Sequence, residues 1–214
     1  MKMSHRLKIA FFGISLLLFF TTPCHAYDVT MAWDKNGEPD LAGYKLYYNT
    51  GISGPPYHGT GATEGNSPIT IGIGNPDDPK DPDFTLRDPD NPQFTLRGLS
   101  DNEIYYFVVT AYDIENLESV YSNEVSNDED VDGMADNWEI AYFGDLSHDG
   151  TGDSEPDGLT DLDEFQNKTD PTNPDSDGDG FTDGEEVTAG TDPNDPQSHP
   201  SKAMPWIPLL LLDD

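Results

Sequence analysis

Three acidic segments in the second half of the chain place carboxylates at the same spacing. In residues 175–186 the first, third, fifth and ninth positions are Asp, the sixth is Gly and the twelfth is Glu. The pattern recurs in 153–164, with Glu at the third position, and in 128–139. A chain that encloses a hard cation must supply roughly six to eight oxygens, a sharp turn at its sixth residue and a long closing carboxylate. The spacing therefore predicts three calcium loops.

Each loop is expected to bind one Ca²⁺, which makes about three ions for the chain. The seventh residue offers its backbone carbonyl, and the ninth-position Asp acts through water. One acidic run in a chain with 42 acids and 10 bases would be solvated surface, but composition does not explain three runs with Gly and Glu in register. The predicted ligands are Asp128, Asp130, Asp132, Met134, Asp136 and Glu139; Asp153, Glu155, Asp157, Leu159, Asp161 and Glu164; and Asp175, Asp177, Asp179, Phe181, Asp183 and Glu186.

The composition limits the partners and the size of any core. The chain has 214 residues, a net charge of −32 and only 34% hydrophobic residues, which favours one or two small domains. Such a field repels nucleic acid and anionic membranes, and it suits divalent cations. The acidic half has few large apolar groups, so we expect calcium binding to supply its folding free energy.

The first half has the alternation of β-strands. Apolar side chains recur at every second residue, and Gly, Pro, Asn and Asp separate the runs. The runs lie at 29–33, 44–48, 69–73, 94–96 and 104–112. Several short strands without helical periodicity predict an antiparallel β-sandwich.

Residues 27–126 resemble a fibronectin type III domain. The resemblance rests on Trp33 in an early strand, the Gly43–Tyr48 segment, Leu99 followed by Tyr105 as in a tyrosine corner, and Tyr121–Val125 as the last strand. It implies a spacer or a protein-binding module. A repeated Phe-Thr-Leu-Arg, at 84–87 and 94–97, lies among prolines, so we expect only the second copy to join the sheet.

Residues 128–199 resemble bacterial thrombospondin type 3 repeats. Residues 153–174 align with 175–196 at a period of 22, including Thr-Asp-Pro after each closing Glu. The resemblance implies further ligands at Asp170 and Asp192. Dockerins, which attach enzymes to scaffolds, are the alternative, but residues 165–174 are too few for their full second helix.

A helix is expected at the end of the first loop, beginning near Trp138. We expect a short helix that ends at Gly144, with Met134, Trp138 and Ala141 as its apolar side. The fold class is therefore all-β: a fibronectin type III-like antiparallel sandwich followed by a mostly irregular calcium-loop repeat segment with short helices.

Both ends of the chain carry apolar segments. Residues 1–26 have basic residues, an apolar run and small residues before Ala26, the pattern of a cleaved signal peptide. We therefore expect a secreted or cell-surface protein that has no membrane insertion after cleavage. The apolar tail, 200–214, is too short to span a membrane. It is open whether this tail is a degenerate sorting signal, a docking peptide or a segment that packs on the chain itself.

The sequence contains no catalytic motif, so we expect a non-enzymatic protein. The sandwich would offer the binding face and the repeats a calcium-stiffened rod, in a structural or adhesive role at a bacterial surface. Its partner would be another extracellular protein or a polysaccharide. The alternative is a dockerin-like or carbohydrate-binding accessory module of an extracellular polysaccharide-degrading system, which an exposed aromatic row with Tyr47 or Tyr106 would favour.

Overall fold

A computed structural model describes residues 9–11, 26–73, 84–86 and 88–201. The chain divides into two compact units, residues 1–141 and 142–214. Most of the predicted signal peptide and of the apolar tail lies outside the described residues. Among the described residues, no helix is both long enough and apolar enough to cross a bilayer.

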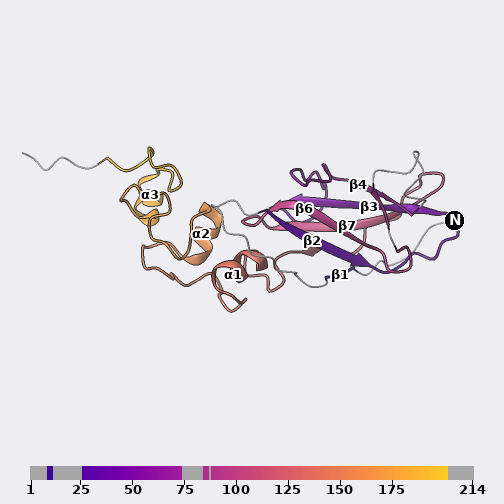
Figure 1. Ribbon diagram of the computed structural model, residues 1–214, viewed down its shortest axis with the longest axis horizontal. Helices are drawn as coiled ribbons and strands as arrows, with labels where there is room; N and C mark the ends of the chain where they lie inside the picture. The colour runs from indigo at the N-terminus through magenta and orange to yellow at the C-terminus, as the bar shows by residue number, and fades with distance from the viewer. Residues whose placement is uncertain (1–8, 12–25, 74–83, 87, 202–214) are drawn as a thin grey trace, which may run out of the picture. The chain divides into compact units, whose positions relative to one another are not determined.

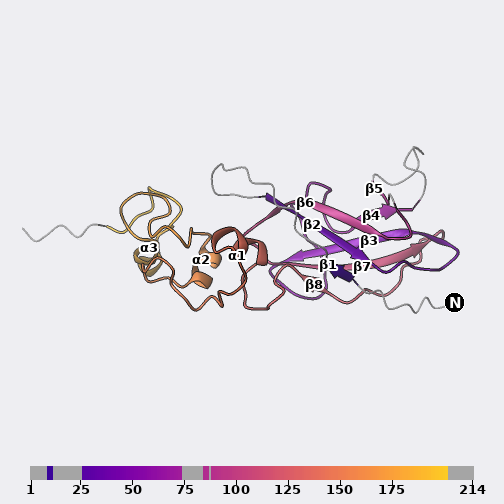
Figure 2. The same cartoon turned by 60° about the horizontal axis from the view of Figure 1, so that its bottom comes forward.

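The first unit contains two facing sheets (Figures 1 and 2). Neighbouring strands are antiparallel except for the parallel β4–β5 pair. The smaller sheet has the order β1-β2-β6, with β1 at Ile9–Phe11, β2 at Ala26–Trp33 and β6 at Gln93–Ser100. The larger has the order β5-β4-β3-β7-β8, with β3 at Leu41–Thr50, β4 at Ile69–Gly72, β5 at Phe84–Thr85, β7 at Tyr105–Asp113 and β8 at Val125–Ser126.

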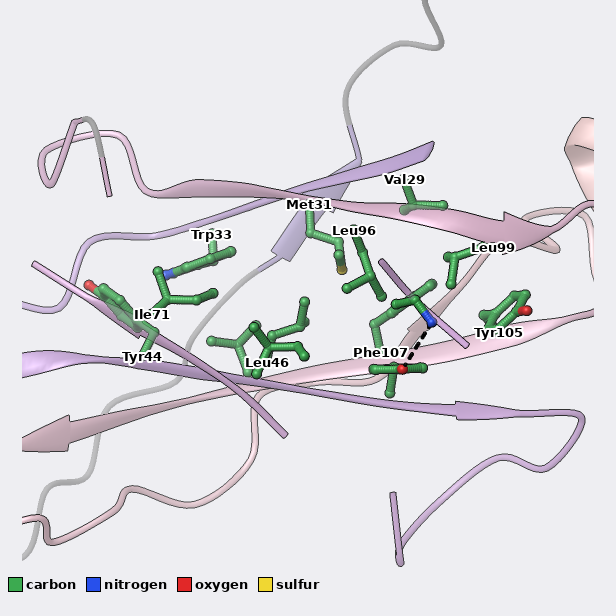
Figure 3. Close-up of a cluster of buried hydrophobic side chains, with 14 of the residues drawn as sticks. Val29, Met31, Trp33, Tyr44, Leu46, Ile71, Leu96, Leu99, Tyr105 and Phe107 are labelled. Carbon is green, nitrogen blue, oxygen red and sulfur yellow. Dashed lines mark hydrogen bonds between the residues drawn. The ribbon is translucent and has the colours of Figure 1, made fainter. Parts of the chain in front are cut away.

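The core lies between these sheets because strand alternation sends every second side chain inward. Figure 3 shows Met31 and Leu96 of the smaller sheet pointing toward Leu46 and Phe107 of the larger one. All four side chains are fully buried. The predicted alternation therefore identifies the buried faces of both sheets, and the antiparallel all-β organisation is confirmed.

Two aromatic residues, Trp33 and Tyr105, lie at opposite ends of the core (Figure 3). The Tyr105 hydroxyl accepts a 3.1 Å hydrogen bond from the backbone nitrogen of Ser100, beside the buried Leu99, which is the tyrosine-corner arrangement. The Trp33 ring packs edge-on against Tyr44, with ring centroids 5.2 Å apart.

The open edge of β7 pairs with an irregular segment rather than with the strand predicted at 121–125. Only Val125–Ser126 forms β8, so the prediction is wrong for residues 121–124. Before β8, Ser119 and Ser122 donate their backbone N–H groups to Ala111 and Val109, both at 2.9 Å. Their hydroxyls accept hydrogen bonds from the N–H groups of the same two β7 residues, both at 3.0 Å. The step of three residues from Ser119 to Ser122 therefore spans a step of only two residues, from Ala111 to Val109, in β7.

Two short strands differ from the sequence expectations. Phe84 and Thr85 pair with Ile71 and Gly72 of β4, so the first Phe-Thr-Leu-Arg copy also joins a sheet. The prolines around it limit that strand to two residues. In addition, Ile9–Phe11 of the predicted signal peptide pairs with Met31–Trp33.

Each acidic segment continues into a seven-residue helix. These are α1 at Asp136–Tyr142, α2 at Asp161–Asn167 and α3 at Asp183–Ala189. Thr160 and Thr182 cap α2 and α3 in capping boxes with Asp163 and Glu185. The helices thus end soon after each closing Glu.

The apolar side of α1 differs by one residue from the prediction. Met134 and Trp138 are buried as expected. Ala141 is exposed, and Ala135 takes the buried place instead. The helix ends before Gly144, which has a φ of +88°.

Candidate metal-binding loops

The ninth residue closes each loop by a hydrogen bond to the second residue. Asp136, Asp161 and Asp183 each accept through Oδ1 from the backbone nitrogen seven residues earlier, at 2.8, 3.1 and 2.9 Å respectively. Asp183 also accepts from the Ser176 hydroxyl at 2.7 Å. These carboxylates therefore shape the loop, and the role through water predicted for the ninth position stays a prediction.

The first residue of a loop fixes the turn inside it. Asp175 accepts from the Gly178 nitrogen at 2.8 Å and from the Gly180 nitrogen at 3.0 Å. Asp153 does the same for Gly158 at 3.2 Å. Gly158 and Gly180 both have positive φ angles, of 103° and 92°, which explains why Gly occupies the sixth position.

The fifth residue orients the seventh. Asp132, Asp157 and Asp179 accept from the backbone nitrogens of the seventh residues, which are Met134, Leu159 and Phe181, at 2.8–2.9 Å. Each bond holds the fifth-position carboxylate against the backbone of the seventh residue. The carbonyl ligands predicted at Met134, Leu159 and Phe181 stay a prediction.

The closing glutamates are buried without a compensating positive charge. Glu139, Glu164 and Glu186 each have a relative exposure of 0%. Both carboxylate oxygens of Glu139, and Oε2 of Glu164 and Glu186, are buried without a hydrogen-bond partner among the described residues. The Oε1 atoms of Glu164 and Glu186 accept from the hydroxyls of Thr169 and Thr191, at 3.4 and 3.2 Å. A buried carboxylate without a cation is costly, so these oxygens are consistent with a metal site.

The electrostatics of the loops agree with this arrangement. Burial, followed by repulsion from the neighbouring loop carboxylates, raises the pKa of Glu139 to about 8 and that of Glu164 to about 9. The same two causes raise the pKa of Asp136 to about 6, although the hydrogen bond from Glu129 opposes them. Among the described residues, no Lys or Arg forms an ion pair with a predicted ligand. A divalent cation would reverse these shifts.

The carboxylates of each loop come together as the spacing predicts. In the second and third loops, the ligand atoms of the first, third and fifth residues lie within 4.8 Å of one another. In the first loop, two overlapping groups form, and Asp130 belongs to both. The members are Asp128, Asp130 and Asp136; Asp130, Asp132 and Glu139; Asp153, Glu155 and Asp157; and Asp175, Asp177 and Asp179. All are oxygen donors, which suit calcium.

The second and third loops are directly connected. Asp157, at the fifth position of the second loop, accepts a hydrogen bond through Oδ2 from the Gly184 nitrogen at the start of α3. The Asn194 side chain donates to the Asn167 carbonyl at 2.9 Å. The repeats therefore form one bonded unit, which the 22-residue period alone does not reveal.

Other polar residues support the loops although the sequence analysis did not select them. His148 lies 3.2 Å from the Asp161 carboxylate, and its ring stacks on Phe143 at 3.8 Å. Asn127, just before the first loop, is buried and bonded to two strands, β2 and β7. Neither residue follows a repeated spacing, so no sequence pattern marks it. Asp170 and Asp192 accept from Thr172 and Asn194 two residues later, and a ligand role for them stays a prediction.

The rings of Tyr47, Tyr57 and Tyr121 do not form a flat row. The Tyr47 hydroxyl donates to Glu118, and the Tyr47 and Tyr57 rings meet Tyr121 at 76° and 79°. Tyr57 is buried, whereas Tyr121 is 43% exposed. The edge-on geometry leaves these rings without a common plane for stacking a sugar.

The comparisons with known proteins identify the repeats. Residues 157–174 and 175–196 match the family model described as the bacterial TSP3 repeat. No curated protein matches the chain. Among solved structures, the chain is similar to pectate lyase PelI from Erwinia chrysanthemi in complex with tetragalacturonic acid, with 14% identity and a TM-score of 0.35. That similarity covers 57% of this chain and 28% of the lyase, and it carries no argument about fold or function. The thrombospondin type 3 resemblance is therefore confirmed for residues 157–196, which supports calcium binding there, and the loop at 128–139 lies outside the match.

Proposed function

We propose that this chain is a secreted, calcium-binding structural or adhesive protein in which calcium stiffens the second unit. The buried, unpartnered oxygens of Glu164 and Glu186 carry the proposal, because a cation is the partner that they lack. The match to bacterial TSP3 repeats supports the choice of calcium. The two ions would be bound by residues 153–164 and 175–186.

Calcium would act here as the main stabiliser of the fold. Few apolar side chains of the second unit are buried, namely Leu159, Phe165, Pro171 and Pro193 among its described residues. Loop carboxylates occupy much of its interior, so its folded state needs their charge neutralised. Extracellular modules bind calcium at about 10⁻⁴–10⁻³ M, and affinities in that range suffice for a secreted protein.

The first unit would supply the contact surface. Its two-sheet architecture and the Tyr105–Ser100 bond support the fibronectin type III resemblance, and such domains work as spacers or protein-binding modules. Exposed apolar residues follow β7, with Ile114 at 73% and Val120 at 72% exposure. These residues suit contact with another extracellular protein, and we assign the chain no catalytic role.

The test is calcium titration calorimetry combined with circular dichroism and limited proteolysis. Glu186→Gln removes a closing ligand, whereas Glu185→Gln changes the same charge on the exposed neighbouring residue and keeps its capping ability. We expect Glu186→Gln to remove one bound ion and Glu185→Gln to leave binding unchanged. Identical binding in both variants, or protease resistance that chelation does not alter, would refute the proposal.

The polysaccharide alternative needs a separate measurement. Tyr121 is the exposed ring of the tyrosine group, so a sugar would have to contact it. Co-sedimentation with insoluble polysaccharides would favour an accessory module only if Tyr121→Ala abolished it. We expect no sedimentation above that of a non-binding control protein.

A further inference from the structure

The loop at 128–139 differs from the other two in its place within the chain. It lies outside the residues that match the TSP3 model, and it belongs to the same compact unit as the sandwich. Its last residue, Glu139, lies within the first turns of α1. An ion bound in this loop could therefore change the stability of the sandwich.

The interior of this loop is suited to a cation. Glu139 is fully buried, and neither of its oxygens has a hydrogen-bond partner among the described residues. An oxygen of Glu139 lies within 4.8 Å of carboxylate oxygens of Asp130 and Asp132. Residues 127–142 contain no Lys, Arg or His that could neutralise these charges. An all-oxygen, carboxylate-rich site selects Ca²⁺ over Zn²⁺, which prefers nitrogen and sulfur ligands.

Asn127 connects this loop to both sheets. Its side-chain oxygen accepts from the Tyr105 nitrogen of β7 at 2.6 Å, and its Nδ2 donates to the Tyr27 hydroxyl of β2 at 2.5 Å. Its backbone carbonyl accepts from the nitrogen of Asp136, the loop residue that begins α1, at 2.9 Å. One buried residue therefore joins the loop to a strand of each sheet.

Asn137 adds a second connection from the helix. Its side-chain oxygen lies 3.3 Å from Nδ2 of Asn127, and its own Nδ2 donates to the Asp101 carbonyl at 3.2 Å. Asp101 follows β6 of the smaller sheet. Ordering of α1 would thus hold the end of the sandwich where β6, β7 and the loop meet.

We propose that residues 128–139 form a calcium site whose occupancy stabilises the β-sandwich itself, with Asn127 coupling the loop to the two sheets. The inference shares its calcium chemistry with the proposed function but concerns another loop, so either can fail alone. In this arrangement calcium folds the second unit and strengthens the first.

Binding to this loop can be observed separately from binding to the repeats. Tb³⁺ takes oxygen ligands as Ca²⁺ does, and Trp138 lies next to Glu139 with only 2% exposure. Luminescence of Tb³⁺ excited through tryptophan should therefore report this loop. We expect Glu139→Gln and Trp138→Phe to abolish the signal and Glu186→Gln to retain it. A signal that survives Glu139→Gln would place the ion elsewhere and overturn the site.

Amide hydrogen exchange of residues 105–113 then measures the coupling. With calcium about 100-fold above its dissociation constant, the slowest exchange in β7 should slow about 100-fold relative to chelated protein. Glu139→Gln should remove this difference, whereas Glu186→Gln should keep it. If Glu186→Gln removed it too, or if calcium left β7 exchange unchanged, the coupling would be refuted.

Two further variants test the connection. Asn127→Ala, or the milder Asn137→Ala if the first does not fold, should keep the Tb³⁺ signal and reduce the calcium effect on β7 at least tenfold. An undiminished calcium effect on β7 in folded Asn127→Ala would overturn the role of Asn127. If Asn127→Ala does not fold, the same result in Asn137→Ala would overturn it. If calorimetry detected no calcium binding at the repeats while the Tb³⁺ signal remained, the proposed function would be refuted and this site would stand.

Discussion

The Asp157 carboxylate accepts a 2.7 Å hydrogen bond from the backbone nitrogen of Gly184, 27 residues later. Asp157 is a predicted ligand of the second loop, and Gly184 lies at the start of the helix that closes the third. The carbonyl of Asp157 approaches so closely that a Cβ on residue 184 would lie 2.5 Å from its oxygen. Only glycine therefore fits at this junction.

Gly184→Ala should separate the two repeats and weaken both sites. The added methyl forces α3 away from Asp157, at a cost of about 1–3 kcal/mol for overpacking. Calorimetry should show lower calcium affinity at both loops rather than at one. Thr188→Ala changes an exposed residue of the same helix and should bind as the parent does. Equal affinities in Gly184→Ala and Thr188→Ala would contradict the coupling.

Calcium binding should release protons and strengthen as pH rises. Without metal, the pKa of Glu164 is raised from 4.5 to about 9, so the folded, metal-free protein binds a proton that the unfolded chain loses above about pH 4.5. The stabilisation from this proton is present below pH 4.5 and is lost as pH rises toward 9. Metal-free protein should therefore be more stable at acidic pH than at alkaline pH.

The calcium-bound protein should show the opposite trend, because calcium requires the deprotonated carboxylate. Calorimetry in buffers of different ionisation enthalpy would count the protons released, and thermal unfolding with chelator would follow the metal-free form. Glu164→Gln should abolish a large part of the release. Affinity independent of pH between about 5 and 8 would contradict the prediction.

Val131→Gly should stabilise the first unit. Val131 has a φ of +63° and is 81% exposed, so a β-branched residue holds a left-handed conformation without packing in return. The third loop has Gly178 at the same position, with a φ of +78°. We expect a gain of about 1 kcal/mol in the free energy of unfolding, after allowing for the added freedom of glycine in the unfolded chain.

Chemical denaturation of the calcium-loaded protein would measure the effect of Val131→Gly. Val120→Gly is the matched control, since Val120 is 72% exposed and does not have a positive φ. It should be neutral or slightly destabilising. A loss of stability in Val131→Gly as large as that in the control would show that the left-handed residue is not strained.

The secreted protein should begin at Tyr27. The predicted signal peptide ends at Ala26, the first residue of β2. Cleavage there would remove β1 and leave the backbone edge of Met31–Trp33 without the pairing that β1 gives it. Mass spectrometry of protein recovered from the culture medium would identify the first residue. A mature chain that retains Ile9–Phe11 would contradict the prediction.

Local sequence patterns predicted the strands and the loops. They did not predict the contacts between residues that are distant in sequence. The alternation around Leu46 and Phe107 identified the core faces, because burial on one side of a sheet imposes a period of two. The loop spacing likewise brought Asp175, Asp177 and Asp179 together. These features depend on residues that are close in sequence.

The features that the sequence did not reveal depend on pairs far apart in it. Asn127 bonds to Tyr27, 100 residues away in sequence. A single buried asparagine belongs to no sequence pattern, so its bonds to distant strands could not be predicted. The end of the sandwich was mispredicted for a related reason. Tyr121 and Val125 alternate like strand residues, but Ser122 hydroxyl bonds replace the regular ladder between them.

The serine-bonded edge of β7 has a consequence for how the protein behaves at high concentration. An open strand edge offers N–H and C=O groups to any other chain, and this makes such edges sites of aggregation. Here the Val109 and Ala111 groups are already bonded to Ser119 and Ser122, whose three-for-two register no regular strand can copy. Copies of the sandwich cannot extend one another's sheets at this edge. At this edge, the bonds to Ser119 and Ser122 therefore oppose self-association through sheet extension.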